Sequence, residues 1–268
     1  MNISTWLIKS MKRLGESGVD APRRDSLVLL EDTLDKDRAW VLAHPEKELN
    51  KEQTDQLETL VARRVRREPL AYIRGKAWFF GRFFNVNPDV LIPRPESEDL
   101  IELVKSIDPK YVVDIGTGSG CLAITIKLEL PKTEVTATDI DQKALKVAQK
   151  NASYHNANIN FVQSDLLSSI SELIHTDTAI VANLPYVPSG LITSPEIRQE
   201  PSGALFSGTD GLSHYDKFWG QVGELETKPQ YVLIESLESQ QKDLESLARR
   251  AGFTLVRVHV LVSLFKRD

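Results

Sequence analysis

The sequence is poor in cysteine, the residue whose disulfides stabilise small secreted proteins. Cys121 is the one cysteine among 268 residues, so an intramolecular disulfide is excluded and a reducing compartment is favoured. A hydrophobic run of about 18 residues is also missing. We also expect no secretory leader, because Lys9, Lys12 and Arg13 follow the first apolar residues. We therefore expect a cytoplasmic protein without a membrane span.

A surplus of basic residues is absent as well. The formal net charge is −5, with 16 Lys and Arg against 14 Asp and Glu in residues 1–90 and 17 against 24 in the remainder. Enzymes that act on nucleic acids usually present a broad basic face. The charge distribution disfavours DNA or RNA as a substrate, although a local patch could still bind a phosphate backbone. We expect no direct nucleic acid partner.

Clustered metal ligands are a third absence. The histidines are scattered without the spacing of metal ligands, at His44, His155, His175, His214 and His259. We therefore expect no metal site. Low-complexity tracts and internal repeats are also missing, so the composition is that of an ordinary globular protein.

The first part of the chain predicts a small helical bundle. Apolar residues such as Leu27, Leu30 and Leu34 recur at helical spacing over residues 2–67. Aromatic and β-branched residues on both sides of Gly81 then indicate a hairpin. We predict a helical domain over residues 1–75 and a hairpin linker over residues 76–90.

Strands and helices alternate in the rest of the chain. The expected strands are residues 111–115, 134–138, 159–163, 178–182 and 231–234, and a terminal hairpin is expected over 253–259 and 261–265. This alternation is typical of a doubly wound, Rossmann-like α/β sheet, whose ligands bind at the carboxyl ends of the strands. We therefore predict a catalytic α/β domain over residues 91–268.

A glycine-rich loop follows the first of these strands. Its residues are Gly116, Thr117, Gly118, Ser119 and Gly120, and Asp114 lies just before it. Glycines at such a turn allow a positive φ and let a ligand approach the backbone closely. The G-x-G-x-G spacing and the preceding acid favour S-adenosyl-L-methionine over a dinucleotide. The carboxylate of Asp114 could face the ammonium or sulfonium end of that cofactor.

Acidic residues end the next two strands. We assign Asp139 to the ribose hydroxyls and Asp141 to the cap of the following helix. After the third strand, Asp165 is placed to accept the adenine amino group, and Leu166 is placed to cover the ring. These assignments rest on position in the predicted sheet.

A tetrapeptide after the fourth strand carries the chemistry. It consists of Asn183, Leu184, Pro185 and Tyr186. The side-chain oxygen of Asn183 and the carbonyl of Leu184 can each accept one N–H of a planar NH2 group, while the ring of Tyr186 covers its flat face. Together with the glycine-rich loop, this pattern predicts a class I methyltransferase that acts on an amide or amino nitrogen. Asn183 would also border the cofactor.

With these residues identified, the chain resembles the HemK/PrmC family of protein-glutamine methyltransferases. The matching segments are residues 68–75 (EPLAYIRG), residues 91–98 (LIPRPESE), the glycine-rich loop, and residues 208–212 (GTDGL). The resemblance implies methyl transfer to the glutamine of the Gly-Gly-Gln motif in class-1 peptide chain release factors. It also implies that the helical domain recognises this protein substrate. We expect a monomer that uses S-adenosyl-L-methionine.

The same resemblance assigns substrate-binding residues. The segment Pro93, Arg94, Pro95 and Glu96 is expected to line the entrance of the active site, because its prolines stiffen a loop that presents two charged side chains. Two positions depart from the family pattern. Leu184 replaces a proline, which leaves the carbonyl in place, and Leu237 replaces a glycine in a turn.

Three other functions remain open from the sequence. Ribosomal-RNA adenine methyltransferases have a similar Asn-Leu-Pro-Tyr segment, but they lack the segment at residues 91–98 and carry a basic face. A DNA adenine or RNA guanine methyltransferase is a weaker alternative. A module that binds the cofactor or a release factor without turnover belongs to a different class, and the intact loop and Asn183 disfavour it.

Overall fold

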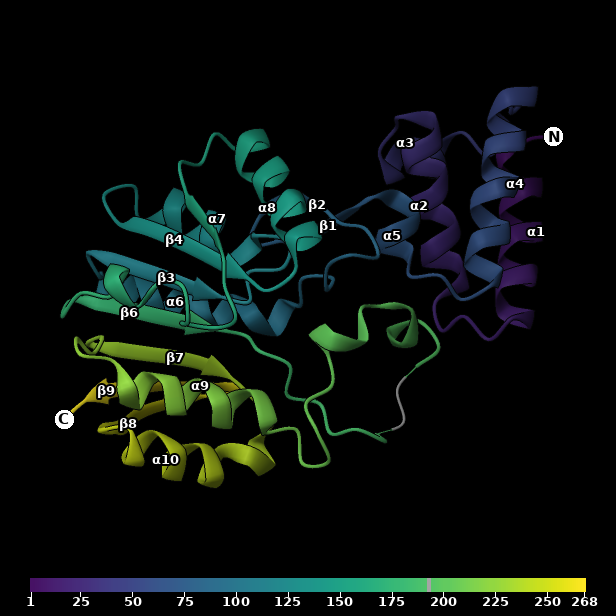
Figure 1. The fold of residues 1–268 in the computed structure, drawn as a ribbon. Coiled ribbons are helices and arrows are strands. Elements are labelled where there is room, and N and C mark those ends of the chain that lie inside the picture. The colour runs from purple at the N-terminus through teal and green to yellow at the C-terminus, as the bar shows by residue number, and fades with distance from the viewer. Residues whose placement is uncertain (192–193) are drawn as a thin grey trace. The chain divides into compact units, whose positions relative to one another are not determined.

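The computed structural model describes residues 1–191 and 194–268 (Figure 1). These residues form two compact units. A helical unit contains residues 1–75 together with residues 194–199, and a sheet unit contains residues 76–191 and 200–268. The short segment 194–199 therefore packs with the helical unit, although the sequence analysis placed it in the α/β domain. The predicted recognition role of the helical domain stays a prediction.

The helical unit confirms the helices expected in the first part of the chain. Its helices are α1 (Ile3–Glu16), α2 (Pro22–Leu34), α3 (Arg38–Ala43), α4 (Lys51–Val65) and α5 (Leu70–Arg74). Local signals explain where they begin. Pro22 occupies the first turn of α2, and Asn50 and Gln53 form a capping box at the start of α4. The helices share a core that includes Trp6, Leu30 and Leu57.

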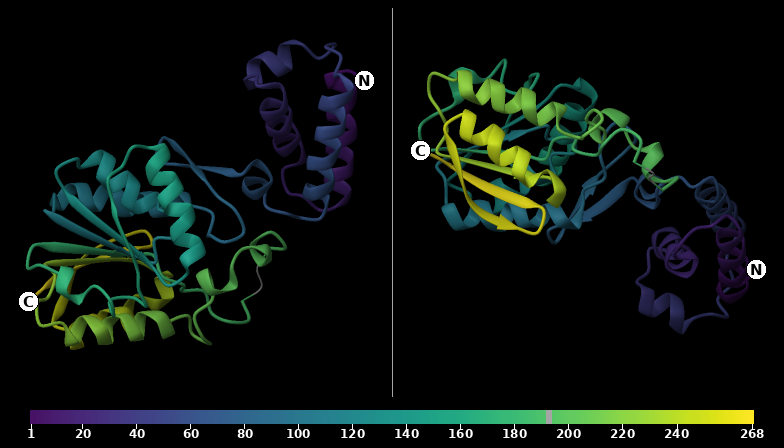
Figure 2. Two further views of the ribbon diagram at one scale, coloured as in Figure 1. Left: turned by 45° about the horizontal axis from the view of Figure 1, so that its top comes forward. Right: turned by 90° about the horizontal axis from the view of Figure 1, so that it is seen from below.

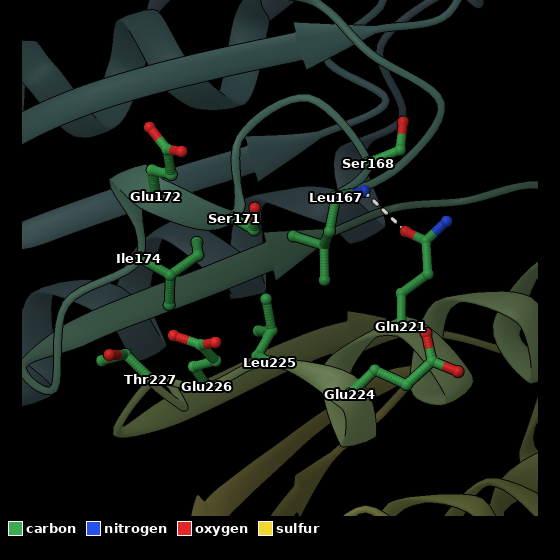
Figure 3. Close-up of a pocket in the computed structure, with 10 residues that line it drawn as sticks. All are labelled: Leu167, Ser168, Ser171, Glu172, Ile174, Gln221, Glu224, Leu225, Glu226 and Thr227. Atoms are coloured by element: carbon green, nitrogen blue, oxygen red, sulfur yellow. Dashed lines mark hydrogen bonds between the residues drawn. The ribbon is translucent and has the colours of Figure 1, made fainter.

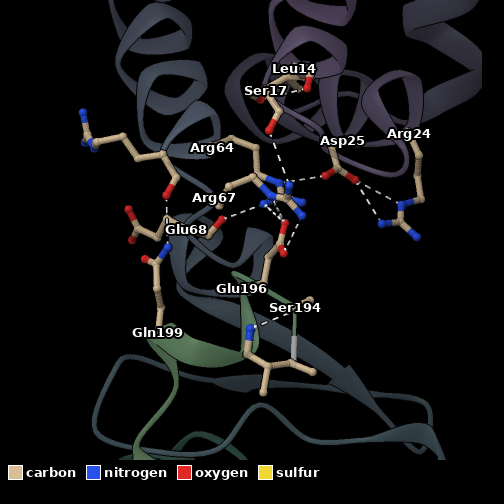
Figure 4. A network of polar contacts seen from close by, with 12 residues as sticks. Leu14, Ser17, Arg24, Asp25, Arg64, Arg67, Glu68, Ser194, Glu196 and Gln199 are labelled. Atoms are coloured by element: carbon tan, nitrogen blue, oxygen red, sulfur yellow. Dashed lines mark hydrogen bonds and ion pairs between the residues drawn. The ribbon is translucent and has the colours of Figure 1, made fainter. Parts of the chain in front are cut away.

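Ion pairs attach the segment 194–199 to α4 (Figure 4). The carboxylate of Glu196 accepts hydrogen bonds from Arg64 at 2.8 Å and from Arg67 at 2.6 and 2.8 Å. Arg64 also donates to the buried Asp25 at 2.9 Å. Burial acts to raise the pKa of Glu196, but the bonds from Arg67 and Arg64 outweigh it and lower the pKa to about 2. Glu196 is therefore charged and held by two arginines.

The sheet unit begins with the predicted hairpin, β1 (Lys76–Phe79) paired with β2 (Arg82–Asn85). Phe80 and Gly81 both have positive φ, at 45° and 75°, as a tight two-residue hairpin turn requires. The hairpin is tied to the rest of the unit by Asn151, whose Oδ1 accepts from the amide of Asn85 at 2.7 Å. The side-chain amide of Asn151 in turn donates to the carbonyl of Ser119 at 2.8 Å. The hairpin thus supports the glycine-rich loop.

The main sheet confirms the predicted doubly wound architecture. Within the described residues its strand order is β5-β4-β3-β6-β7-β9-β8. The strands are β3 (Tyr111–Ile115), β4 (Glu134–Asp139), β5 (Asn160–Gln163), β6 (Thr178–Ala182), β7 (Tyr231–Glu235), β8 (Phe253–His259) and β9 (Val262–Arg267). The first five strands in that list are parallel, and β9 pairs antiparallel with both β7 and β8. The terminal hairpin therefore inserts its last strand beside β7 and leaves β8 at the edge.

Helices cover both faces of this sheet (Figure 2). One face packs against α6 (Glu98–Ile107), α7 (Cys121–Glu129) and α8 (Gln142–Tyr154), and the other packs against α9 (Ser213–Glu224) and α10 (Gln241–Arg250). Burial on both faces explains why the central strands are almost wholly apolar. In the part of the chain that the structure describes, no helix is long and apolar enough to cross a membrane.

Removing the charge of Glu196 should loosen the segment 194–199. We expect Glu196→Gln to lower the free energy of unfolding of the helical unit by about 1–3 kcal/mol, because charged hydrogen bonds to two arginines are lost. The wild-type contribution is present above the pKa of an unfolded glutamate, about 4.3, and is lost as the pH falls towards the folded value. Hydrogen exchange of residues 194–199 should rise in the variant. Glu46→Gln, at an exposed turn, serves as the control, and equal exchange in both variants would contradict the role of the ion pairs.

Candidate functional site

A cavity of about 640 Å³ opens where the carboxyl ends of β3, β4 and β6 meet. Its volume lies within the range of roughly 300–1,000 Å³ that small-molecule sites occupy. The structure brings many of the predicted site residues together on its wall: Gly116, Gly118, Asp139, Asp165, Leu166, Asn183, Leu184 and Pro185. All of them belong to the sheet unit. The order of β3 between β4 and β6 makes this edge the topological switch point of the sheet, where ligands bind in such folds.

The glycine-rich loop forms the floor of this cavity. Gly118 has a φ of 55°, and a β-carbon added there would enter open space, so its backbone is accessible to a ligand. Gly120 has a φ of 79°, and a β-carbon there would lie 3.0 Å from the side chain of Ala148 on α8. The positive φ favours glycine at both positions, and at Gly120 close packing against α8 leaves no room for a side chain. The amide of Thr117 donates to the carbonyl of Thr138 at 2.8 Å and fixes the loop against β4.

Asp139 joins the loop to the end of β4. Its Oδ2 accepts from the amide of Gly118 at 2.9 Å, and its Oδ1 accepts from the amide of Asp141 at 2.9 Å. Burial raises the pKa of Asp139, and these backbone bonds act in the opposite direction. Asp141 accepts from the amide of Lys143 at 2.8 Å, which confirms the predicted helix cap. The assignment of Asp139 to ribose stays a prediction, and its place on the cavity wall is compatible with it.

Asp114 lies in a different place from the one expected. Its side chain is fully buried beneath the loop and does not belong to the cavity wall. Its Oδ2 accepts from the hydroxyl of Thr117 at 2.6 Å. Burial raises the pKa of Asp114 to about 7, against the opposing effect of that hydroxyl. The strand alternation that buries Val113 on one face turns Asp114 to the other, so Asp114 supports the loop from below. Thr117, Ser119 and Gly120 likewise contribute structure to the loop without lining the cavity.

Asp165 and Leu166 lie at the far end of the cavity. The carboxylate of Asp165 forms an ion pair with Lys217 on α9, and both side chains are about half exposed. Leu166 is buried and has a φ of 56°. The amide of the next residue, Leu167, donates to Gln221 on α9 at 2.8 Å. Helix α9 therefore fixes the turn that carries the predicted adenine contacts.

A second hollow lies beside this turn (Figure 3). It has a volume of about 550 Å³ and is lined by the side chains of Glu172, Glu224 and Glu226, among others. None of the predicted site residues lies on its wall. Among the described residues, no group of three or more His, Cys, Asp or Glu is arranged to hold a metal ion.

The orientation of Asn183 is determined by two neighbours. Its side-chain NH2 group donates to the hydroxyl of Ser97 at 2.9 Å and to Oε2 of Glu235 at 3.1 Å. Both N–H bonds are therefore used within the protein. Among the hydrogen bonds of the described residues, none is accepted by Oδ1 of Asn183, which leaves this oxygen available at the cavity.

Tyr186 shares the same acid. Its hydroxyl donates to Oε1 of Glu235 at 2.8 Å. Burial and the nearby charge of Glu235 raise the pKa of Tyr186, so its hydroxyl keeps its proton. The carbonyl of Tyr186 is also held, because Gln240 donates to it at 2.8 Å. The ring is thereby fixed beside Asn183, although the cavity wall does not include it.

Leu184 occupies a buried position between the loop and α9. A β-carbon added to Gly116 would lie 3.2 Å from its side chain, and its amide points at the hydroxyl of Tyr215 at 3.4 Å. Pro185 follows on the cavity wall. The backbone around the predicted carbonyl acceptor is therefore well supported even without the family's proline.

The predicted entrance segment lies near the site but outside the cavity wall. Arg94 donates to Oε1 of Glu200 at 2.6 Å, and the amide of Ile92 donates to Oε2 of the same residue at 3.0 Å. Pro93 is half-buried, whereas Pro95 and Glu96 are exposed. The substrate contacts assigned to this segment stay predictions. The segment is linked to Asn183 through the next residue, Ser97, whose hydroxyl accepts a hydrogen bond from the Asn183 side chain.

Glu235 and Ser97 are the site residues that sequence reasoning missed. Glu235 directly follows the strand predicted over residues 231–234 and had no role assigned to it. A signal was present, because Glu235 is an acidic residue at the end of an otherwise apolar strand, Tyr231–Glu235. That signal becomes specific only when the sheet places β7 beside β6.

Comparisons with known proteins show the family of the chain. Residues 5–75 match the family described as PrmC N-terminal domain, and residues 95–200 match the methyltransferase small domain. A release factor glutamine methyltransferase of Koribacter versatilis is 40% identical over 233 residues, covering 84% of this chain and 82% of the relative. The corresponding enzyme of Coxiella burnetii is 37% identical and covers 87% and 85%. That of Bacillus anthracis is 34% identical and covers 90% and 88%.

Solved structures support the fold alone. The hMettl16 catalytic domain, in complex with a MAT2A 3′UTR hairpin, matches with a TM-score of 0.55 at 14% identity, covering 81% of this chain and 82% of that chain. A T. thermophilus 16S rRNA methyltransferase, in complex with AdoMet and guanosine, matches with a TM-score of 0.51 at 19% identity, covering 72% and 50%.

The buried Asp114 should make stability depend on pH. Its folded pKa of about 7 lies above the value of an unfolded aspartate, about 3.9, so the native state binds the proton more tightly. Stability should therefore fall as the pH rises between these values, by on the order of 1–4 kcal/mol. Asp114→Asn should lose this dependence in denaturant unfolding at pH 5 and pH 8. Asp243→Asn, at an exposed position, is the control. An unchanged pH dependence in Asp114→Asn would contradict the assignment.

Proposed function

The chain belongs to the family of release factor glutamine methyltransferases, and we propose that it methylates the glutamine of the Gly-Gly-Gln motif in class-1 peptide chain release factors. The methyl group is transferred from S-adenosyl-L-methionine to the side-chain amide nitrogen. The protein is an S-adenosyl-L-methionine-dependent methyltransferase, and its modification of a release factor would support translation termination.

One observation carries this proposal. Both N–H bonds of Asn183 are used by Ser97 and Glu235, so Oδ1 is the part of the side chain that a ligand can reach. A carboxamide substrate brings two N–H donors in one plane. Oδ1 of Asn183 can accept one of them, and the carbonyl of Leu184 can accept the other. This pair of acceptors selects an NH2 group over a hydroxyl or a thiol.

The residues around the cavity fit S-adenosyl-L-methionine. Gly118 leaves open space for a ligand against the loop, and Asp139 presents a half-buried carboxylate at the end of β4. Leu166 offers an apolar surface on the same wall. We assign the loop, Asp139, and the pair Asp165 and Leu166 to its binding. When bound, the cofactor supplies an activated methyl group on a sulfonium centre.

The protein's contribution to the reaction is positioning. An amide nitrogen is a poor nucleophile, because its lone pair is delocalised into the carbonyl group. Acceptors on both N–H bonds orient the nitrogen and favour the pyramidal geometry in which its lone pair is free. In the transfer, the nitrogen would gain the methyl group that the cofactor supplies, the electrons of the broken bond would stay on the cofactor's sulfur, and the nitrogen would release one proton to water. Tyr186 would cover the flat face of the amide.

The remaining contacts of the proposal concern the protein substrate. We assign Pro93, Arg94, Pro95 and Glu96 to the approach of the Gly-Gly-Gln loop, and the helical unit to the body of the release factor. The net charge of −5 supports a protein rather than a nucleic acid as partner. A monomer that acts in the cytoplasm is part of the same proposal.

Methylation of a purified release factor tests the function directly. We expect one added methyl group on the Gly-Gly-Gln glutamine by mass mapping and none on ribosomal RNA in a parallel reaction. Asn183→Ala should reduce the rate by about 100-fold or more while it still binds the cofactor, because one acceptor of the reacting group is lost. Methyl on RNA and none on glutamine would overturn the proposal in favour of an RNA adenine methyltransferase.

Leu184 tests which atom of that residue takes part. We expect Leu184→Pro to keep methyl transfer within about tenfold of the wild type, because the carbonyl is retained, although a long hydrogen bond from the amide and part of the buried side-chain packing are lost. Initial rates with the release factor measure this. A folded Leu184→Pro variant that transfers no methyl group would show that keeping the carbonyl is not sufficient, and would contradict this expectation.

A further inference from the structure

Glu235 is a buried carboxylate without a cation. It ends β7 after three buried apolar residues, and its side chain is fully buried. Within the described part of the chain, no Lys, Arg or His forms an ion pair with it. A charge in such a place is costly unless hydrogen bonds compensate for it. The position of Glu235 beside the reacting group therefore needs an explanation other than stability.

The compensating hydrogen bonds all come from the site. Oε2 accepts from Asn183 at 3.1 Å, and Oε1 accepts from Tyr186 at 2.8 Å. Ser97 accepts the second N–H of Asn183 at 2.9 Å and hydrogen-bonds Glu235 in turn. The acid thus contacts both polar members of the tetrapeptide, and it does so from outside the cavity wall.

This arrangement selects one of the two orientations of the Asn183 amide. In the observed orientation, the NH2 group faces Glu235 and Ser97, and Oδ1 is left for a ligand. Rotation by 180° would place Oδ1 against the carboxylate and present the NH2 group to the substrate. The hydrogen bond to Glu235 would be lost and two oxygen acceptors would face each other, while the hydroxyl of Ser97 would have to turn from acceptor to donor. The NH2 group of a flipped Asn183 would also face the NH2 group of the substrate, so two donors would meet without an acceptor.

We propose that Glu235 is a positioning residue that holds Asn183 in its accepting orientation and fixes the ring of Tyr186 beside it. The inference rests on the proposed function, since it assigns Asn183 Oδ1 to the NH2 group of the substrate. Glutamine would fill this role incompletely. It has one acceptor oxygen, so if that oxygen accepts from Asn183, its NH2 group faces Tyr186, whose hydroxyl must then accept instead of donating, and the charge-assisted character of both hydrogen bonds is lost.

The first test compares Glu235→Gln with Ser236→Ala. Ser236 is equally buried at the end of the same strand, and its hydroxyl has no hydrogen-bond partner among the described residues. We expect Glu235→Gln to lower kcat about 10- to 100-fold, because a small misplacement of a reacting group has effects of this size. Its KM for the release factor and its Kd for S-adenosyl-L-methionine should change less than about threefold. Ser236→Ala should match the wild type in all three. An unchanged kcat in Glu235→Gln, or an equal loss in cofactor affinity, would overturn the inference.

A double variant that exchanges the amide group of Asn183 and the carboxylate group of Glu235 gives a sharper test. Asn183→Asp places a carboxylate against Glu235 and should be nearly inactive. In the double variant with Glu235→Gln, the NH2 group at position 235 can donate to one carboxylate oxygen at position 183. The other carboxylate oxygen at position 183 is then left to accept from the substrate. We expect the double variant to be at least about tenfold more active than Asn183→Asp, because the pair acts as a unit. A double variant no more active than Asn183→Asp would overturn the inference.

The design separates this inference from the proposed function. If the wild type methylates RNA and leaves the release factor unmodified, the proposed function fails, and the same variants compared on that RNA still decide the role of Glu235. If Glu235→Gln does not fold, Ser97→Ala replaces it, since it removes the other acceptor of Asn183. We expect a loss of about 3- to 10-fold in kcat with unchanged cofactor affinity. No loss in a folded Ser97→Ala would count against the mechanism.

Discussion

The parallel register of β3, β4 and β6 is the constraint on which the site depends. Ile115 is paired with Thr138 on one side and with Ala182 on the other, so these three strands end level with one another. The segments that follow them therefore leave the sheet at the same edge. That is why the glycine-rich loop, Asp139 and Asn183 meet, although the sequence separates them by long helices. The backbone hydrogen bonds that set this register therefore determine which side chains meet in the cavity.

Patterns local in sequence could be predicted, and contacts between distant segments could not. The apolar strands, the glycine-rich loop and the cap at Asp141 each depend on neighbouring residues, and the structure confirms them. Glu235 was missed because its partners lie after the end of β6 and just before α6, far away in sequence. Asp114 was assigned to the ligand because it adjoins the loop, yet strand alternation places it beneath the loop.

The site and the fold identify the protein to different degrees. The sheet is shared with proteins whose solved structures contain an RNA hairpin or guanosine, at identities below 20%, so it does not discriminate between substrates. Discrimination comes from side chains and from relatives that align over most of the chain. In the proposed site, substrate choice would depend on the direction of a single amide group, which no fold comparison detects. A buried acid and a serine outside the cavity wall accept the two N–H bonds of that group.

The segment 194–199 makes the helical unit discontinuous in sequence. A gene fusion that exchanged residues 1–75 for a different recognition module would remove Arg64 and Arg67 but keep Glu196 in the recipient chain. The recipient would then carry an unpaired acid on an unsupported stretch, only four residues before Glu200, which holds Arg94. A single recombination event after residue 75 would therefore break these ion pairs and destabilise the product. The two parts of this protein are expected to have been inherited together, and the arginines of α4 and the acid at position 196 should change in concert across its relatives.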